Sequence, residues 1–286
     1  AIQHPSNARR VLRTDVPLTL LNVGSGHDSG MVLHISLDGL RPDAITPETC
    51  PFLNQMLRDG LGTRLAQTVM PSVTLPCHTS MFRGVPPTRH GITSNVFTPL
   101  ARPVPSLVDW AFQHGKRTGM FFNWNELRDL CAPPSFAVVG MNWDNQSLPG
   151  DAHIADLAIE AIQTQNLDYV FLYQGFIDTA GHRHGWMSPE YLAAATHADA
   201  QVRRAVEAAQ AIDPGVVVIW MSDHGGHDRG HGTEMPEDMT IPFCLYGQSI
   251  SAGELTGVEI MDCASTVSAL LGLGAHPDWE GTSRVP

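Results

Sequence analysis

The chain has 286 residues, 43% of them hydrophobic and 16% charged, which is typical of a globular protein with a large core. Its 29 acidic and 17 basic residues give a formal net charge of -12. Duplex nucleic acid is therefore excluded as an expected partner, because binding it requires a basic face.

Membrane and secretion signals are absent from the sequence pattern. No apolar run reaches the roughly 18 to 20 residues that a membrane span needs, and residues 1–20 lack the apolar region of a signal peptide. The five cysteines are scattered without a C-x-x-C spacing, which favours a reducing compartment. We therefore expect a cytoplasmic protein with no membrane partner. A periplasmic or secreted location is the alternative if a signal peptide was removed before Ala1.

Residues 1–30 are predicted to form an irregular arm, and residues 31–286 a single α/β domain, since no repeat or polar linker divides them. Strands are predicted over residues 31–37, 62–70, 116–124, 167–174, 215–222, 241–247 and 257–261. Helices are predicted over residues 51–60, 106–115, 151–164, 188–212 and 262–274, with a short helical turn before Gly84. Ser188 and Asp262 are the expected N-caps of the last two helices.

The alternation of strands with helices of ten or more residues decides the fold class. Several of the predicted strands are continuous apolar runs, which indicates burial on both faces. We therefore expect a three-layer α/β/α fold with a mostly parallel central sheet.

Polar side chains directly follow three of the predicted strands. They are Asp38 after residues 31–37, Asp178 and His182 after residues 167–174, and Asp223 and His224 after residues 215–222, with His227 and His231 close behind. Ligands of open α/β sheets bind outside the carboxyl ends of the strands, so these side chains are expected to converge. Three carboxylates at one edge repel each other unless positive charge lies between them.

Taken one at a time, these residues have ordinary explanations. An Asp after a strand is often a helix N-cap or a turn residue, and a single His is usually hydrogen-bonded in a core or on a surface. Carboxylate and imidazole together at two strand ends, with a third carboxylate beside them, indicate metal binding instead. Oxygen and nitrogen ligands without thiolate suit zinc, with manganese as the harder alternative. Two ions with open coordination positions would be catalytic.

Thr74 is the candidate nucleophile. It lies just before Pro76 and the helical turn that Gly84 closes, which places it at a helix N-terminus. The unpaired backbone N–H groups there favour an alkoxide or a phosphoryl oxygen. The alternative is that Thr74 is only a helix N-cap, a role that Thr fills well.

Five ordered motifs resemble the alkaline phosphatase superfamily, and most closely its nucleotide pyrophosphatase/phosphodiesterase group. They are SLDGLRPD (36–43), PSVTLPCH (71–78), PPTRHGITSN (86–95), FIDTAGHRHG (176–185) and SDHGG (222–226) followed by a nearby H-G. The similarity runs from about residue 31 to the last predicted helix. It implies an alkaline-phosphatase-like fold and two metal ions.

The resemblance also implies a role for each site residue. One zinc ion would be bound by Asp178, His182 and His231, and the other by Asp38, Asp223, His224 and the hydroxyl of Thr74. Asn95 matches the asparagine that, with the backbone N–H next to the nucleophile, holds a phosphoryl oxygen. The expected reaction is hydrolysis of a small-molecule phosphate ester, preferably a phosphodiester, through a phosphothreonine on Thr74.

The sequence departs from the family pattern at three points. Leu75 replaces the aromatic residue that stacks on a nucleobase, and Cys77 replaces the usual Asn. A long insertion before the last histidine ligand is missing, which makes His227 a rival to His231 as a ligand. We prefer His231 because its G-H-G context allows close backbone approach.

The same fold is compatible with several alternative functions. A phosphomonoesterase, a phosphonate-cleaving enzyme or a phosphomutase would use similar residues. A sulfatase is disfavoured, because position 74 is Thr and lacks the C/S-x-P-x-R context of that chemistry. A different class is a catalytically inactive binding module that keeps the metals as structural elements.

Overall fold

The computed structural model describes residues 30–100 and 103–285, so the predicted arm lies, apart from residue 30, outside the described residues. These residues form one eight-stranded sheet in the order β4-β3-β5-β1-β6-β7-β2-β8. The strands are β1 (Val32–Leu37), β2 (Leu61–Gln67), β3 (Thr118–Phe122), β4 (Val138–Met141), β5 (Tyr169–Gln174), β6 (Val217–Met221), β7 (Thr240–Tyr246) and β8 (Gly253–Glu254). That residues 31–286 make up a single domain stays a prediction.

The sheet is mixed but mostly parallel, as predicted. β1 lies at its centre and pairs in parallel with β5 on one side and β6 on the other. β3 and β4 extend the parallel part beyond β5. Of the strands in the described chain, β7 alone runs against its neighbours β6 and β2.

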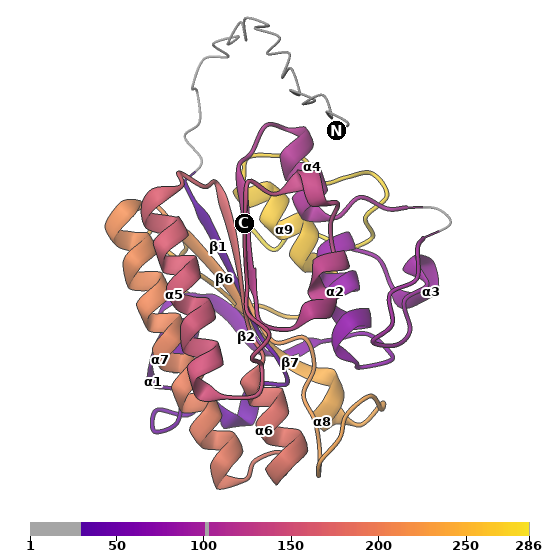
Figure 1. Cartoon of the computed structure of the whole chain (residues 1–286), viewed down its shortest axis with the longest axis vertical. Coiled ribbons are helices and arrows are strands. Elements are labelled where there is room, and N and C mark those ends of the chain that lie inside the picture. Colours follow the sequence, from indigo (N-terminus) through magenta and orange to yellow (C-terminus); the bar gives the residue numbers. More distant parts are fainter. Residues whose placement is uncertain (1–29, 101–102, 286) are drawn as a thin grey trace, which may run out of the picture.

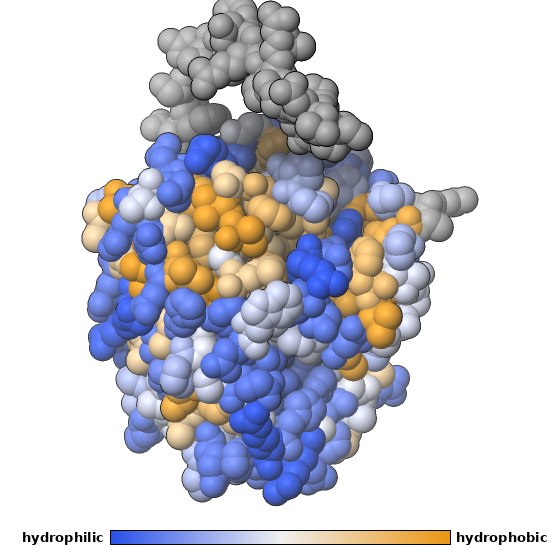
Figure 2. All heavy atoms as spheres, in the orientation of Figure 1, coloured by the Kyte–Doolittle hydropathy of each residue, from blue (hydrophilic) through white to orange (hydrophobic). Residues whose placement is uncertain are grey.

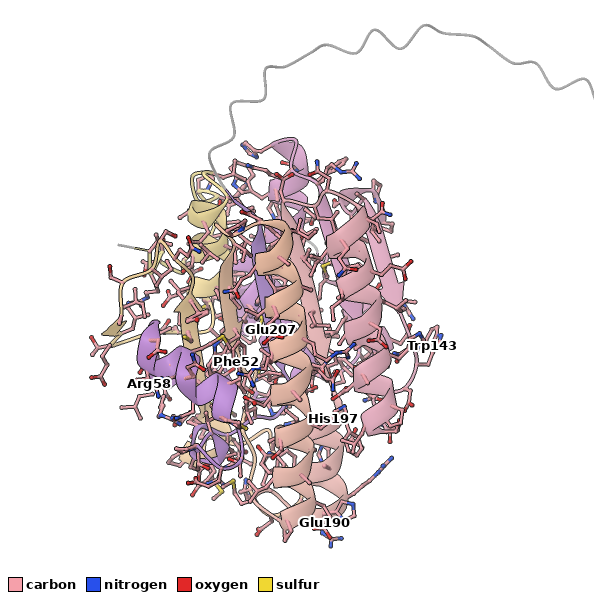
Figure 3. All side chains as sticks on the ribbon, turned by 90° about the vertical axis from the view of Figure 1, so that its left-hand side faces the viewer. Phe52, Arg58, Trp143, Glu190, His197 and Glu207 are labelled. Atoms are coloured by element: carbon pink, nitrogen blue, oxygen red, sulfur yellow. The ribbon has the colours of Figure 1, made fainter. Side chains whose placement is uncertain are left out.

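Helices cover both faces of the sheet, which confirms the three-layer architecture (Figure 1). Figure 3 looks at the face on which α7 lies between α1 and α5, and the opposite face carries α2, α4 and α9. The helices are α1 (Pro51–Asp59), α2 (Thr74–Arg83), α3 (Pro87–His90), α4 (Leu107–Gln113), α5 (Leu148–Thr164), α6 (Phe176–His184), α7 (Pro189–Ile212), α8 (Pro236–Met239) and α9 (Asp262–Leu270). Short 3-10 helices cover Pro42–Ala44, Asn125–Asp129 and Pro133–Ser135.

Alternation along β1 divides the core between the two faces. Leu33, Ile35 and Leu37 are fully buried under α1, α5 and α7. His34 and Ser36 point to the other face, where the ring of His34 lies 5.8 Å from that of Phe82 in α2. Strand β1 is therefore enclosed on both sides, and only its carboxyl end leads to the site.

Most of the predicted elements agree with the structure, and the differences are as follows. The side chain of Ser188 caps α7 by accepting a hydrogen bond from the backbone N–H of Tyr191, as predicted. The strand predicted over residues 257–261 is wrong: this segment makes a single bridge from Glu259 to Gln67, because the chain turns where Asp262 accepts the N–H of Glu259. Asp262 is the first residue of α9, not its N-cap. Strands β4 and β8 and helices α3, α6 and α8 lie in segments for which the sequence predicts no element.

The carboxyl ends of β1, β5 and β6 lie at the same end of the molecule, near α6 and α8 (Figure 1). On the face of the molecule that Figure 2 shows, residues at this end are predominantly hydrophilic, whereas hydrophobic residues gather toward the opposite end. Among residues 30–100 and 103–285, no helix has the length and apolar character needed to cross a bilayer.

The fully buried His34 predicts how stability depends on pH. Burial, followed by the nearby His78, lowers its pKa from 6.5 to about 3. Below pH 6.5 the unfolded chain binds a proton that the folded chain rejects, so the free energy of unfolding should fall by up to about 1.4 kcal/mol per pH unit down to about pH 3. Urea unfolding at several pH values should show a shallower dependence for His34→Gln. Equal slopes for His34→Gln and the wild type would contradict the prediction.

Candidate active site

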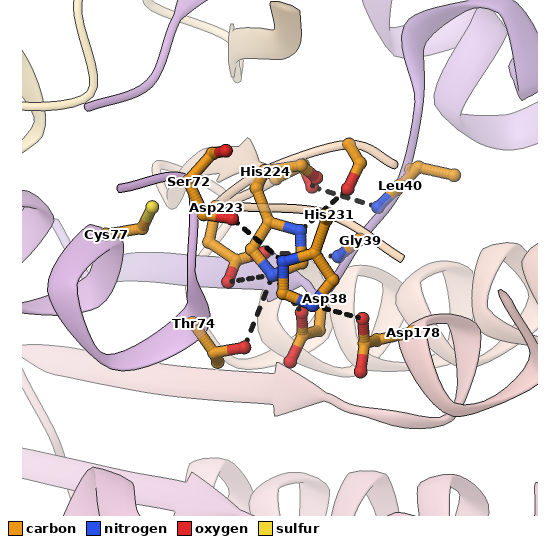
Figure 4. Close-up of polar contacts among 12 residues, drawn as sticks. Asp38, Gly39, Leu40, Ser72, Thr74, Cys77, Asp178, Asp223, His224 and His231 are labelled. Carbon is orange, nitrogen blue, oxygen red and sulfur yellow. Dashed lines mark hydrogen bonds and ion pairs between the residues drawn. The ribbon is translucent and has the colours of Figure 1, made fainter. Parts of the chain in front are cut away.

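The sheet brings together the three carboxylates that the sequence places at strand ends (Figure 4). Asp38 follows β1, Asp223 follows β6, and Asp178 lies in the first turn of α6, directly after β5. Because β5, β1 and β6 are neighbours in the sheet, side chains from distant parts of the sequence meet at one edge.

The first group of potential ligands consists of Asp178, His182 and His231. His182 lies four residues after Asp178 on α6, so both project from one side of the helix. The Oδ1 atom of Asp178 lies 3.5 Å from the Nε2 atoms of both histidines, which are 3.2 Å from each other. Three donor atoms thus point to a common centre, as metal ligands do.

The second group is centred on His224. Its Nε2 atom lies 3.3 Å from Oδ1 of Asp38, 3.3 Å from Oδ2 of Asp223 and 3.2 Å from the hydroxyl oxygen of Thr74. Asp38, Asp178 and His224 each offer one ligand atom, and these atoms lie within 4.8 Å of one another. Asp178 therefore borders both groups.

The three histidines are oriented in the same way by the backbone. Nδ1 of His182 donates to the carbonyl of Arg229 at 2.9 Å, Nδ1 of His224 donates to its neighbour Gly225 at 2.8 Å, and Nδ1 of His231 donates to Ser72 at 2.8 Å. Since a carbonyl can only accept, the Nδ1 atoms carry the protons. Each Nε2 is thereby directed at the site, which is the arrangement that metal-binding histidines use.

The carboxylates supply matching oxygen atoms. Oδ1 of Asp38, Oδ1 of Asp178 and Oδ2 of Asp223 are buried without a hydrogen-bond donor. Buried acceptors are normally satisfied, so three such atoms in one place form a candidate cation site. Oxygen and imidazole nitrogen donors fit divalent ions such as zinc or manganese. That all these residues act as ligands stays a prediction.

The electrostatics of the site show the same need for positive charge. Burial, followed by repulsion from Asp38, raises the pKa of Asp178 well above its ordinary value. Burial and repulsion from Asp223 likewise raise the pKa of Asp38. Burial would lower the pKa of His224, but the attraction of Asp223 and Asp38 outweighs it and raises the pKa to about 10. In the protein without metal, a proton on His224 therefore partly neutralises the carboxylates.

Donors fix the other carboxylate oxygen of Asp38 and of Asp223. The hydroxyl of Tyr173 donates to Oδ2 of Asp38, and the N–H of Gly39 donates to Oδ1 of Asp223 at 3.1 Å. Gly39 has a φ of 68°, and a Cβ atom there would lie 3.2 Å from Cα of Asp178, so both conformation and space require glycine. The free oxygens of the carboxylates are thus turned toward the histidines.

Thr74 is the first residue of α2, and the N-cap is Val73, whose side chain makes no capping hydrogen bond. The interpretation of Thr74 as an N-cap is therefore wrong. Its hydroxyl faces His224 instead. The N–H of the next residue, Leu75, donates to Oδ1 of Asn95 at 2.9 Å, so Asn95 lies beside the backbone group with which the resemblance pairs it.

The structure separates the two rival histidines. Nδ1 of His227 lies 2.7 Å from Oδ1 of Asp238, whose other oxygen accepts the N–H of Thr233. His227 thus holds the loop between β6 and α8, while His231 lies with Asp178 and His182. The departures from the family pattern also have a structural meaning, since Leu75 is fully buried in the core and cannot stack on a base.

Two buried residues of the site were missed in the sequence. Tyr173 is the penultimate residue of β5, and a buried tyrosine needs a partner for its hydroxyl. His78 lies one helical turn after Thr74 and bridges the carbonyl of Thr74 and the hydroxyl of Ser36, both at 2.8 Å. The i, i+4 spacing from the candidate nucleophile was the available signal for His78.

The mostly parallel sheet, with two His/Asp groups at its carboxyl end, defines a class of α/β protein with an alkaline-phosphatase-like fold. The family model "Type I phosphodiesterase / nucleotide pyrophosphatase" matches residues 32–233, which is more than half of the sequence. The chain therefore belongs to the type I phosphodiesterase/nucleotide pyrophosphatase family of the alkaline phosphatase superfamily.

Individual relatives agree with this assignment. The chain is 28% identical over 208 residues to human ectonucleotide pyrophosphatase/phosphodiesterase family member 7, covering 63% of this chain and 45% of the relative. It is 24% identical over 225 residues to venom phosphodiesterase of Macrovipera lebetinus, covering 70% and 26%. The chain thus spans less than half the length of these curated relatives. Murine ectonucleotide pyrophosphatase/phosphodiesterase 5, solved in complex with AMP, shares the fold with a TM-score of 0.73 at 16% identity, covering 87% of this chain and 96% of that one.

The two histidines provide a test of the first ligand group. We expect His231→Ala to lower the metal content from about two ions per chain to about one, because it opens a three-residue coordination shell. His227→Ala, which removes only a hydrogen bond to Asp238, should keep both ions. Elemental analysis after removal of excess metal measures the content. Equal content in both variants, or a larger loss in His227→Ala, would show that His231 is not the ligand.

Proposed function

We propose that this protein is a metal-dependent hydrolase of small phosphodiesters that uses Thr74 as its nucleophile. The observation that carries the proposal is the place of the Thr74 hydroxyl, 3.2 Å from Nε2 of His224 and at the N-terminus of α2. Two unpartnered carboxylate oxygens, Oδ1 of Asp38 and Oδ2 of Asp223, lie 3.3 Å from the same Nε2 atom. A threonine that served only the helix would need none of these neighbours.

The family and the donor atoms together support two divalent ions. Asp178, His182 and His231 would hold one, and Asp38, Asp223, His224 and the Thr74 hydroxyl the other. When bound, such ions lower the pKa of a coordinated hydroxyl and neutralise charge on the phosphoryl group.

Thr74 would act in two steps. Its oxygen forms a bond to phosphorus as the bond from phosphorus to the leaving-group oxygen breaks; the threonine loses its proton, and the leaving alcohol gains one. A water molecule then attacks the phosphothreonine, breaks its bond to Thr74 and returns a proton to the threonine oxygen. We assign the side-chain NH2 of Asn95 to a phosphoryl oxygen; its Oδ1 accepts the N–H of Leu75 at 2.9 Å, and this N–H could join as a second donor once that hydrogen bond opens.

We expect the substrate to bind without the base stacking by which a nucleotide would be held. Because Leu75 is buried, the position after the nucleophile offers no aromatic surface for a base. The link from His224 to His231 is also short, with Gly225 and Gly226 tied by hydrogen bonds to the carbonyls of Asp238 and Glu237. The proposal therefore requires only that the substrate be a phosphodiester, and nucleobase recognition is not part of it.

A parallel assay of four p-nitrophenyl esters tests the reaction type. With zinc-loaded protein, the phosphodiester should give a higher kcat/KM than the phosphomonoester, the phosphonate or the sulfate. A preference for the phosphomonoester or the phosphonate would identify one of the alternative hydrolases. Failure to cleave any ester despite bound metal would favour an inactive binding module.

Replacing Thr74 distinguishes a role as nucleophile from a purely structural role. Thr74→Ala should lower kcat by several orders of magnitude, because no covalent intermediate can form. It should change the free energy of unfolding by less than about 1 kcal/mol, since Thr74 caps no helix. Thr74→Ser keeps the attacking oxygen and should retain a substantial part of the activity. Turnover of Thr74→Ala near the wild-type rate, with unchanged metal content, would remove Thr74 from the mechanism.

A further inference from the structure

Helix α6 carries two side chains of the first ligand group but has no N-terminal cap of its own. Its N-cap residue is Gly175, which has no side chain to accept the free N–H groups of the first turn. A Cβ atom at Gly175 would lie 2.9 Å from Cβ of Asn145 and 2.9 Å from Cε1 of Tyr173, so packing excludes a capping side chain there. The start of α6 therefore depends on a group from elsewhere.

That group is Asp151, which lies in the first turn of α5 and is 1% exposed. Its Oδ1 accepts the N–H of Gly175 at 3.1 Å, and both of its oxygens lie 3.3 Å from the N–H of Phe176. The side-chain amide of Asn123, directly after β3, donates to Oδ1 at 2.7 Å. The carbonyl of Asp151 accepts the amide of Gln174 at 3.0 Å. One residue thus joins β3, β5, α5 and the start of α6.

The consequence for the site follows from the short distance along the chain. Asp178 lies only two residues after Phe176, and His182 one turn further along the same helix. Rotation or fraying of the first turn of α6 would displace the carboxylate of Asp178 from His231.

We propose that Asp151 is a positioning residue for metal binding, which holds Asp178 and His182 in place by capping α6 from a neighbouring helix. This inference rests on the proposed two-metal function. Asp151 contacts neither the ligand side chains nor the substrate position through any of its hydrogen bonds; it acts through the backbone of Gly175 and Phe176.

The chain contains a matched control. Asp199 of α7 is 4% exposed and caps α1 in the same manner, because its carboxylate accepts the N–H groups of Phe52 at 3.2 Å and Leu53 at 2.7 Å. Helix α1 carries no residue of the candidate site. Asp199→Ala should therefore weaken folding much as Asp151→Ala does, without touching the ligands.

The experiment measures zinc affinity on metal-free protein by competition with a chelating dye. Burial raises the pKa of Asp151 to about 7, so the titration is made at about pH 8, where the wild-type carboxylate is ionised. We expect Asp151→Ala to weaken one of two zinc sites by about 10- to 100-fold. Asp151→Asn keeps an oxygen that can accept the same N–H groups and should recover most of the affinity. Asp199→Ala should bind zinc as the wild type does, even where its melting temperature is lowered.

If Asp151→Ala does not fold, Asn123→Ser provides the test, because it removes the donor that orients the carboxylate and leaves the cap itself. It should weaken the same zinc site by a smaller factor. Wild-type zinc affinity in Asp151→Ala, or in Asn123→Ser where only that variant folds, would overturn the inference, as would an equal loss of affinity in Asp199→Ala. If the wild-type protein binds no zinc, the proposed function fails, and this inference fails with it.

Discussion

Repulsion among three buried carboxylates is the constraint around which this structure is arranged. Asp38, Asp178 and Asp223 come from adjacent strand ends, and each leaves one oxygen without a donor. In a site of low polarity such charges raise each other's pKa, as the directions for Asp38 and Asp178 show. Protons on the carboxylates and on His224 reduce this repulsion, and in the proposed function divalent ions do so.

The surrounding structure keeps these groups from relaxing away from one another. A backbone carbonyl orients each of the three histidines. In Asp38 and Asp223 a hydrogen bond to one carboxylate oxygen fixes the direction of the other. Asp178 is placed by helix α6. Gly39 is central to this arrangement. Its N–H binds Asp223, its carbonyl accepts from Trp186 and Tyr191, and its missing side chain makes room for Asp178. Positioning of this kind gives a metal site its geometry before any ion binds.

The proposed nucleophile and two of the proposed ligands lie on different helices. Thr74 begins α2, where the helix N-terminus favours negative charge on an attacking oxygen or a phosphoryl group. Asp178 and His182 lie on α6, whose first turn is held by Asp151 from α5. The sheet beneath these helix starts packs apolar side chains on both faces. A site of this kind tolerates changes of substrate through its loops while the chemistry stays with the strand ends.

The sequence by itself determined the alternation of strands and helices and the mostly parallel sheet. It also determined the sheet edge at which Asp38, Asp178 and Asp223 meet. These features follow from local patterns, namely apolar runs and the polar residues directly after them. Proximity alone left His227 and His231 as rivals, and only the folded loop pairs His227 with Asp238. Tyr173 and Asp151 likewise act on residues 135 and 24 to 25 positions away in the chain. Such contacts depend on the order of the strands and the placement of the helices. Only the tertiary structure decides them, because a local sequence pattern does not specify which distant group a buried donor or acceptor will contact.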